Sequence, residues 1–171
     1  MDILAHMLWA NYGTRVGNKK LKKENKPLIK LPWATFWGVF PDLFAFAVPM
    51  ILVMPTLLKN GFSFDRHHFG LSSILYQYSH SLVIWAVVFS IVWILYKRPK
   101  LELLGWALHI LIDIPSHAVN FYPTPFLFPL SEYRFPYGIS WGNTTYMIIN
   151  YSLLLIISLY FFKKKNKNAT P

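Results

Sequence analysis

Long runs of apolar residues are the feature that most restricts what this chain can fold into. A helix needs about 20 mostly apolar residues to cross the hydrocarbon core of a bilayer. Residues 74–96 and 144–162 meet this length, and basic residues follow both. Residues 33–58 are long enough but contain three prolines, which predict a kinked or broken helix. Residues 101–118 form a shorter fourth candidate whose second half is more polar.

The first twelve residues, MDILAHMLWANY, are too short to span a bilayer and lack the basic flank of a signal peptide. They predict a half-span, interfacial or re-entrant helix. Only 14% of the 171 residues are charged, whereas a soluble domain is about a quarter charged. We therefore expect an all-α fold, a polytopic membrane helix bundle with about four spanning helices plus the short N-terminal helix. Residues 1–171 would form a single membrane-embedded domain.

The basic residues predict the orientation, because cytoplasmic loops carry the excess of lysine and arginine. Of the 17, seven lie in residues 15–30, three in 97–100 and four in 163–167. We therefore expect a basic cytoplasmic loop (15–30), a basic cytoplasmic tail (163–171) and a location in the cell (inner) membrane. The proline-rich, aromatic segment 119–143 is the expected outer loop, folded back as a lid. The net charge of +10 is then explained by the membrane topology, and no specific nucleic-acid binding is predicted. The basic segments would also attract anionic lipid headgroups.

The segment HILIDIPSH, residues 109–117, places ionisable side chains in an apolar run. His109 and Asp113 are four residues apart, so they share one face of a helix and can share a ligand. His117 would continue that face, but Pro115 disfavours helical geometry before it. We therefore expect His117 to lie beyond the helix end, away from the other two.

Other ionisable residues occupy similar depths in the expected spans. His80 lies nine residues from the outer start of its span and His109 nine from the outer end of its own, so both would lie about 13 Å below the outer surface. Asp42 follows Pro41, where a helix break would let its carboxylate turn inward. His6 reaches the same level only if the first helix packs against the bundle.

These side chains predict a metal site. Without cysteines, such a site must use nitrogen and oxygen ligands, which suit zinc, and a bound metal would lower the pKa of water to about 7. The candidate ligands are His6, Asp42, His80, His109 and Asp113, and Asp42 or Asp113 would accept the proton as the catalytic residue.

Each residue also has a structural explanation. A lone histidine can donate to a backbone carbonyl, His109 and Asp113 can join two helices, and Asp42 can cap a helix. His68 and Arg134 lie in the expected outer loops, where they would ordinarily be solvated. Alternatively, His68, Arg134 and His117 would contact the metal ligands or the substrate.

The order of the motifs AHMLWA, FPDLF, YSHSL and HILIDIPSH, followed by YPTPFLFPLSEYRF, resembles the YdjM-like family of predicted membrane-bound metal-dependent hydrolases. This family is thought to be distantly related to zinc-dependent phospholipases C. The resemblance implies that Asp42, His80, His109 and Asp113 ligate metal, with Asp113 bridging toward a second ion held partly by His6. The chain has Leu75, Tyr76 and Gln77 where the family has histidine, arginine and glycine. Either a second metal or a phosphate contact is therefore missing, or His68 or His117 substitutes for the absent group.

Three functions remain open from the sequence. The first is a membrane-bound, metal-dependent hydrolase of a phosphoester or lipid-like substrate, in which Arg134 or backbone donors hold the anion. The second is an intramembrane proton or metal-ion relay or transporter, and the third is a non-catalytic membrane protein with a buried polar network. A relay should string its groups across the membrane, whereas a hydrolase should gather them at one depth.

Overall fold

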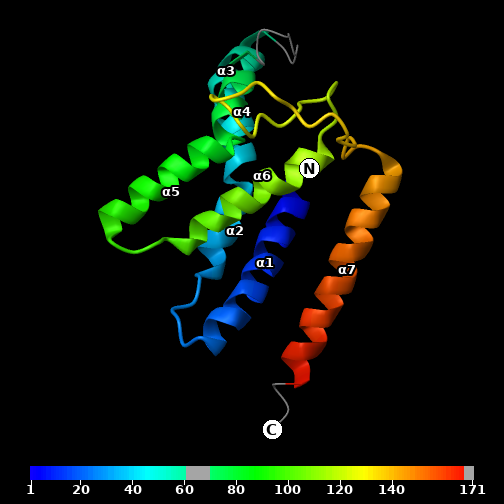
Figure 1. Cartoon of the computed structure of the whole chain (residues 1–171). Coiled ribbons are helices and arrows are strands. Elements are labelled where there is room, and N and C mark those ends of the chain that lie inside the picture. Colours follow the sequence, from blue (N-terminus) through cyan, green and yellow to red (C-terminus); the bar gives the residue numbers. More distant parts are fainter. Residues whose placement is uncertain (61–69, 168–171) are drawn as a thin grey trace.

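The computed structural model describes residues 1–60 and 70–167, and all regular secondary structure in these ranges is helical (Figure 1). This confirms the all-α expectation. Large apolar side chains remain exposed on several helices, and on α5 (Leu82–Tyr96) no residue is buried. Such extensive apolar exposure is expected of helices that face lipid.

The first helix, α1 (Ile3–Lys23), is longer than the half-span expected from the sequence. Asp2 caps its start by accepting a hydrogen bond from the Ala5 amide, and three lysines in its last turn complement the helix dipole. The expected basic loop 15–30 is therefore helical as far as Lys23. Lysine has a high helix propensity, which a reading based on charge alone does not take into account.

The second segment runs through α2 (Leu31–Asp42), the π-helix η1 (Leu43–Ala47) and α3 (Val48–Asn60). It begins with Pro32 in the first turn, where the missing amide costs nothing. Pro41 is accommodated by the π-helical turn that follows Asp42 rather than by a break. Residues Leu31–Pro55 are long and apolar enough to cross a membrane.

The candidate span over 74–96 is not one continuous helix, because the chain bends by 59° between α4 (Gly70–Ser79) and α5 (Leu82–Tyr96). Ser81 starts a new helix by accepting hydrogen bonds from the amides of Val83 and Ile84. The freed carbonyl of Ser79 accepts a bond from the Trp106 indole, and the Leu82 amide donates to the Phe126 carbonyl. Tertiary contacts therefore replace the hydrogen bonds that the bend removes.

The 3₁₀ turn η3 (Leu101–Leu103) leads into α6 (Leu104–Ser116), which has only 13 residues. At 1.5 Å per residue this helix is about 20 Å long, shorter than a hydrocarbon core of about 30 Å. In the described ranges, two helical segments qualify as spans, Leu31–Pro55 and Thr144–Lys164, and the bent α4–α5 pair adds a third if it counts as one span. Four spans are therefore not shown.

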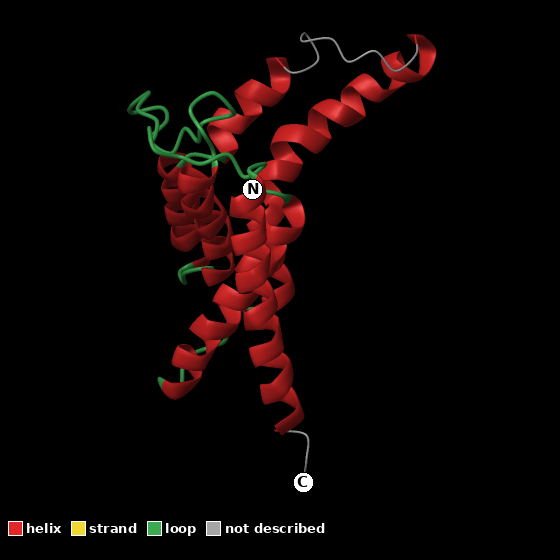
Figure 2. Cartoon of the chain, turned by 90° about the vertical axis from the view of Figure 1, so that its right-hand side faces the viewer, coloured by secondary structure: helices red, strands yellow, loops and turns green. Residues whose placement is uncertain are grey.

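The last helix, α7 (Thr144–Lys167), packs along α1 (Figures 1 and 2). Polar contacts join the two helices: the Trp9 indole donates to Asn150, and the Tyr12 hydroxyl lies 2.6 Å from that of Ser158. Interhelical bonds of this kind stabilise helix pairs in lipid, where apolar contact alone gives little preference.

Small residues bring α1, α2 and α6 into close contact. A Cβ atom at Gly38 would lie 2.2 Å from the Ala10 Cβ, and one at Gly105 would lie 2.1 Å from the Ala34 carbonyl oxygen. Neither site has room for a side chain, so glycine sets the distances between these backbones. The helices α2 and α6, which hold three of the four residues of the polar cluster described below, are thereby fixed against each other and against α1.

The segment 119–143 folds back over the ends of α4 and α6 (Figure 2, green). The amides of Ile139 and Trp141 donate to the carbonyls of Pro115 and Ser116, and the Tyr76 hydroxyl donates to the Tyr122 carbonyl. The segment therefore covers the end of the bundle at which the polar cluster lies.

Candidate metal centre

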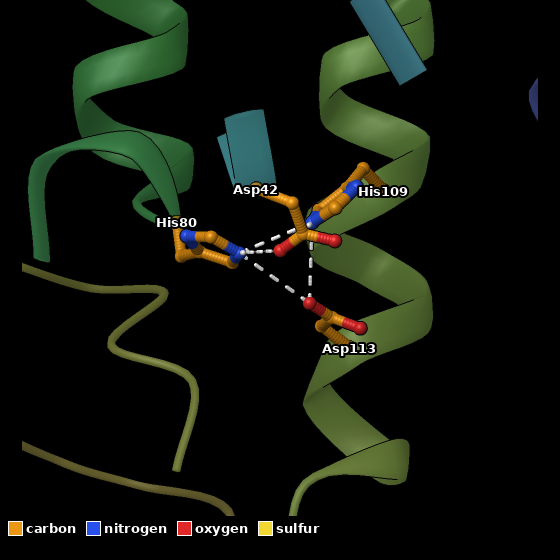
Figure 3. A group of neighbouring side chains, drawn as sticks. All are labelled: Asp42, His80, His109 and Asp113. Atoms are coloured by element: carbon orange, nitrogen blue, oxygen red, sulfur yellow. Dashed lines mark hydrogen bonds and ion pairs between the residues drawn. The ribbon is translucent and has the colours of Figure 1, made fainter. Parts of the chain in front are cut away.

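Four ionisable side chains converge in the interior: Asp42, His80, His109 and Asp113 (Figure 3). Each residue offers one ligand atom, and all these atoms lie within 4.8 Å of one another. We call these four residues the His/Asp cluster. The convergence expected from the shared depth of the motifs is confirmed.

Local sequence explains where each member lies. Asp42 ends α2 just after Pro41, and the π-helical turn begins at the next residue. His80 occupies the break between α4 and α5, where its ring stacks on Tyr76 with centroids 3.8 Å apart. His109 and Asp113 lie on successive turns of α6, as their four-residue spacing predicts.

The distances within the cluster are short. His80 Nε2 lies 3.4 Å from Asp42 Oδ1, 3.5 Å from Asp113 Oδ2 and 3.1 Å from His109 Nε2. His109 Nε2 in turn lies 3.2 Å from Asp113 Oδ2. Both imidazoles therefore point their Nε2 atoms at the space between the two carboxylates.

A hydrogen bond on the side of the His109 ring away from the cluster determines which ring nitrogen carries the proton. Its Nδ1 lies 2.8 Å from the carbonyl oxygen of Gly38, which can only accept, so Nδ1 carries the proton. The Nε2 lone pair of the neutral ring then faces the cluster. Metal-binding histidines are commonly oriented by this kind of bond to a backbone carbonyl.

His6, the fifth expected ligand, lies against the cluster. Its ring stacks on that of His109 with centroids 3.6 Å apart, and its Nε2 lies 3.0 Å from Asp113 Oδ1. That contact does not have hydrogen-bond geometry, and among the described residues neither ring nitrogen of His6 has a hydrogen-bond partner. The Oδ2 atom of Asp113 is likewise buried without one. Leaving buried polar atoms unpaired is costly, and a cation among them would satisfy these lone pairs.

The expectation that Pro115 carries His117 away is wrong. His117 is the C-cap residue of α6, and its Nε2 lies 3.5 Å from Asp113 Oδ1. Its Nδ1 lies 2.7 Å from the Tyr122 carbonyl, so the proton is on Nδ1 and the Nε2 lone pair again points inward. The returning segment, bonded to Pro115 and Ser116, holds the end of the helix in this position.

Two groups at the site were not among the residues expected from the sequence. The α-amino group of Met1 lies 2.6 Å from Asp113 Oδ1 and 2.9 Å from His117 Nε2. Tyr76, one of the three residues at which the chain differs from the motif that it was expected to resemble, is buried and contacts His80, His117 and the Tyr122 carbonyl. No sequence motif identifies an α-amino group as part of a site. The position of Tyr76, one helical turn before His80, is the signal that could have identified it.

The remaining two residues expected near the site are His68 and Arg134. His68 lies outside the described residues. Arg134 is in the returning segment, where its guanidinium donates to the Tyr133 carbonyl. Among the described residues, Arg134 has no ion pair with a member of the cluster.

An apolar cavity of about 710 Å³ reaches the cluster at Asp42 and also borders His117. Its walls come from the start of α1, from η1 and α3, and from the aromatic residues Phe121, Tyr122 and Trp141. The Asp42 side chain is 11% exposed, whereas those of His80, His109 and Asp113 are fully buried. Asp42 is thus the member of the cluster that a molecule in the cavity would meet.

Comparisons of the chain with models of known protein families, with curated proteins and with solved structures give no match. Any functional conclusion therefore depends on the residues themselves. Two imidazoles and two carboxylates, buried together and within reach of one point, can hold a divalent metal ion.

Proposed function

We propose that this protein is a membrane-bound, metal-dependent hydrolase and a member of the YdjM-like family. The observation that carries the proposal is the convergence of the His/Asp cluster at the inner end of an apolar cavity. Asp42, His80, His109 and Asp113 would be the ligands, and His6 and His117 would complete or extend the set.

The donor set favours zinc. Neutral imidazoles and carboxylates are ligands that zinc commonly uses, and the carbonyl of Gly38 orients His109 as a ligand. Two carboxylates close together repel each other in a low-dielectric interior, and the Met1 amino group can offset only one of their two charges. A divalent ion offsets that repulsion, so the charges of the cluster fit the proposed cofactor.

The carboxylates of the cluster would have different roles in hydrolysis. A bound divalent cation supplies Lewis-acid polarisation of an ester oxygen and makes water a better nucleophile. Asp42, which borders the cavity, is placed to accept the proton of the attacking water. Asp113 is fully buried and held by the Met1 amino group and the Ser116 hydroxyl, so it serves as a fixed ligand.

The cavity supports a lipid-like substrate. Its volume lies within the range of about 300 to 1,000 Å³ typical of small-molecule sites. Most of its lining is apolar, including Leu43, Phe46 and Met50, while the polar groups gather where it meets the cluster. A phosphoester or carboxylic ester with an apolar tail would place its tail in the cavity and its reactive group beside Asp42.

The alternative of a proton or ion relay is less well supported. A relay requires ionisable groups strung across the depth of the membrane, whereas here they gather around one point. We place the cluster toward the outer face, because Met1 contacts Asp113, and the basic end of α1 and the end of α7 lie at the opposite end of the molecule from the N-terminus (Figure 1). The inner cell membrane with a cytoplasmic C-terminus is the orientation that the positive-inside rule favours.

The test is metal content measured together with hydrolysis. The full chain, purified in detergent without chelator, should contain zinc and hydrolyse phospholipid in mixed micelles. Asp113→Asn keeps the shape but removes a ligand charge, so bound zinc and turnover should fall together. The matched control Glu132→Gln removes an exposed acidic charge in the outer segment and should change neither. Wild-type protein that contains no metal and takes up no added zinc would refute the proposal and leave a structural polar network.

A further inference from the structure

A second cavity, of about 380 Å³, lies at the basic end of the molecule and is unrelated to the His/Asp cluster. It is formed where the turn between α1 and α2 meets the connection between α5 and α6. The Lys30 amide lies 3.4 Å from Glu102 Oε1, a contact that joins the two segments. Four basic side chains line the cavity: Lys26, Lys30, Arg98 and Lys100.

Three of these cations are free to bind an anion. Lys26 is paired with Glu24 at 2.8 Å, and that bond lowers the pKa of the Glu24 carboxyl. In residues 1–60 and 70–167, no carboxylate lies within ion-pair distance of Lys30, Arg98 or Lys100. Glu102 lines the same cavity, so three uncompensated cations face one carboxylate. The net positive charge suits a phosphate group, which arginine binds in bidentate fashion and lysine as a point charge.

An apolar groove continues from this basic cavity. It has a volume of about 430 Å³, shares Lys30, Lys100 and Glu102 with the basic cavity, and extends between α2 and α5. The apolar lining consists of Trp33, Trp37, Val88, Val92, Tyr96 and Leu103. The Lys100 Nζ atom lies 4.4 Å from the centroid of the Tyr96 ring, and Lys100 lines both the basic cavity and the apolar groove. Aromatic rings beside cations are typical of the level of the lipid headgroups.

We propose that the basic cavity and the apolar groove together form a binding site for an anionic glycerophospholipid. Lys30, Arg98 and Lys100 bind its phosphate, and one acyl chain lies along the groove between Trp37 and Val92. Basic pockets between membrane helices on the cytoplasmic side are known to take such headgroups. A free phosphate would use only the basic cavity, and a neutral lipid only the groove.

Lipid binding to the full chain in detergent tests this site. Delipidated protein is titrated with phosphatidylglycerol, phosphatidylcholine and inorganic phosphate, and bound lipid is counted by native mass spectrometry. Phosphatidylglycerol should bind at least about tenfold more tightly than either of the others. The triple variant Lys30→Gln, Arg98→Gln and Lys100→Gln should lose about tenfold in phosphatidylglycerol affinity.

The control removes the same charge from the same end of the molecule. The triple variant Lys20→Gln, Lys22→Gln and Lys23→Gln alters the last turns of α1, outside both cavities, and should bind phosphatidylglycerol like wild type. Equal losses in the two triple variants would overturn the proposal in favour of general charge attraction. Equal affinity for phosphatidylcholine, or phosphate binding as tight as lipid binding, would also overturn it. Should the first triple variant not fold, Arg98→Gln alone should still weaken phosphatidylglycerol binding, and wild-type affinity would count against the site.

Discussion

The Nε2 atoms of His80 and His109 lie 3.1 Å apart, with both rings held in place. His109 is fixed by the Gly38 carbonyl, and His80 by its stacking on Tyr76 and by a contact of 2.9 Å between its Nδ1 and the Ser79 hydroxyl. Two lone pairs facing each other at this distance repel. The arrangement is therefore stable with a metal ion between the carboxylates and imidazoles, or with a proton on His80 Nε2 donated to His109. These two states lead to different measurements.

Removal of metal should destabilise the wild-type protein. Binding at a hundredfold excess over Kd contributes about 2.7 kcal/mol, which corresponds to a fall in Tm of about 5 to 10 °C on chelation. Added zinc should restore the Tm. The variant Asp113→Asn should show no such response, as measured by thermal unfolding in detergent. A proton-bonded network predicts the same Tm for the wild type with and without chelator.

His117→Gln should affect hydrolysis more than metal content. The imidazole lies beside Asp113 and borders the cavity, but it is outside the four-residue group whose ligand atoms converge. We expect His109→Gln to abolish zinc binding and His117→Gln to retain most of it while turnover falls about tenfold or more. Elemental analysis and phospholipid turnover of the two variants check this. Equal zinc loss in both would make His117 a primary ligand.

Filling the apolar cavity should separate substrate binding from metal binding. Ala47 lines the cavity, so Ala47→Phe would occupy space that the substrate tail needs. Turnover of phospholipid should fall while zinc content stays at the wild-type level. Ala86→Phe, a matched change at an exposed position on α5, should leave both unchanged. Unaltered turnover in Ala47→Phe would show that the substrate does not enter here.

Gly105→Ala should destabilise the bundle. The added Cβ would lie 2.1 Å from the Ala34 carbonyl oxygen, so α2 and α6 would have to move apart. Overpacking of this kind costs about 1 to 3 kcal/mol, visible as a lower Tm. Gly70→Ala is the control, since no atom of the described residues 1–60 and 70–167 lies within 4 Å of its added Cβ. Equal stability of the two variants would mean that the helices adjust freely.

Local patterns in the sequence predict much of this structure. The spacing of His109 and Asp113 places them on one helix face, and their depth relative to His80 places all three at one level. Both predictions depend only on regular helix geometry, and long apolar segments predict helices well. The basic segment after α1 and the connection 97–100 likewise lie close together, since both line the second cavity.

The features that local patterns miss depend on contacts distant in sequence. The bend after Ser79 is stabilised by contacts with Trp106 and Phe126, and the polar residues Ser79, His80 and Ser81 within an otherwise apolar run do not by themselves specify it. The position of His117 depends on residues 139 and 141, which bond to the end of α6. Pro115 marks the helix end correctly, but it does not determine the direction in which the next side chains point.

The π-helical turn after Asp42 has a further consequence for how this site can change. A π turn contains one more residue than an α turn, so η1 shifts the rotational phase of everything after it by about 100°. Asp42 precedes the turn, so its position is set by the packing of α2 against α1 and α6. Phe46 lies within the turn and Met50 after it, and both form part of the cavity wall. Loss of a single residue from η1 would keep the ligand in place and rotate the wall away. The turn thus lets the chain vary what it accommodates independently of how it holds a cation.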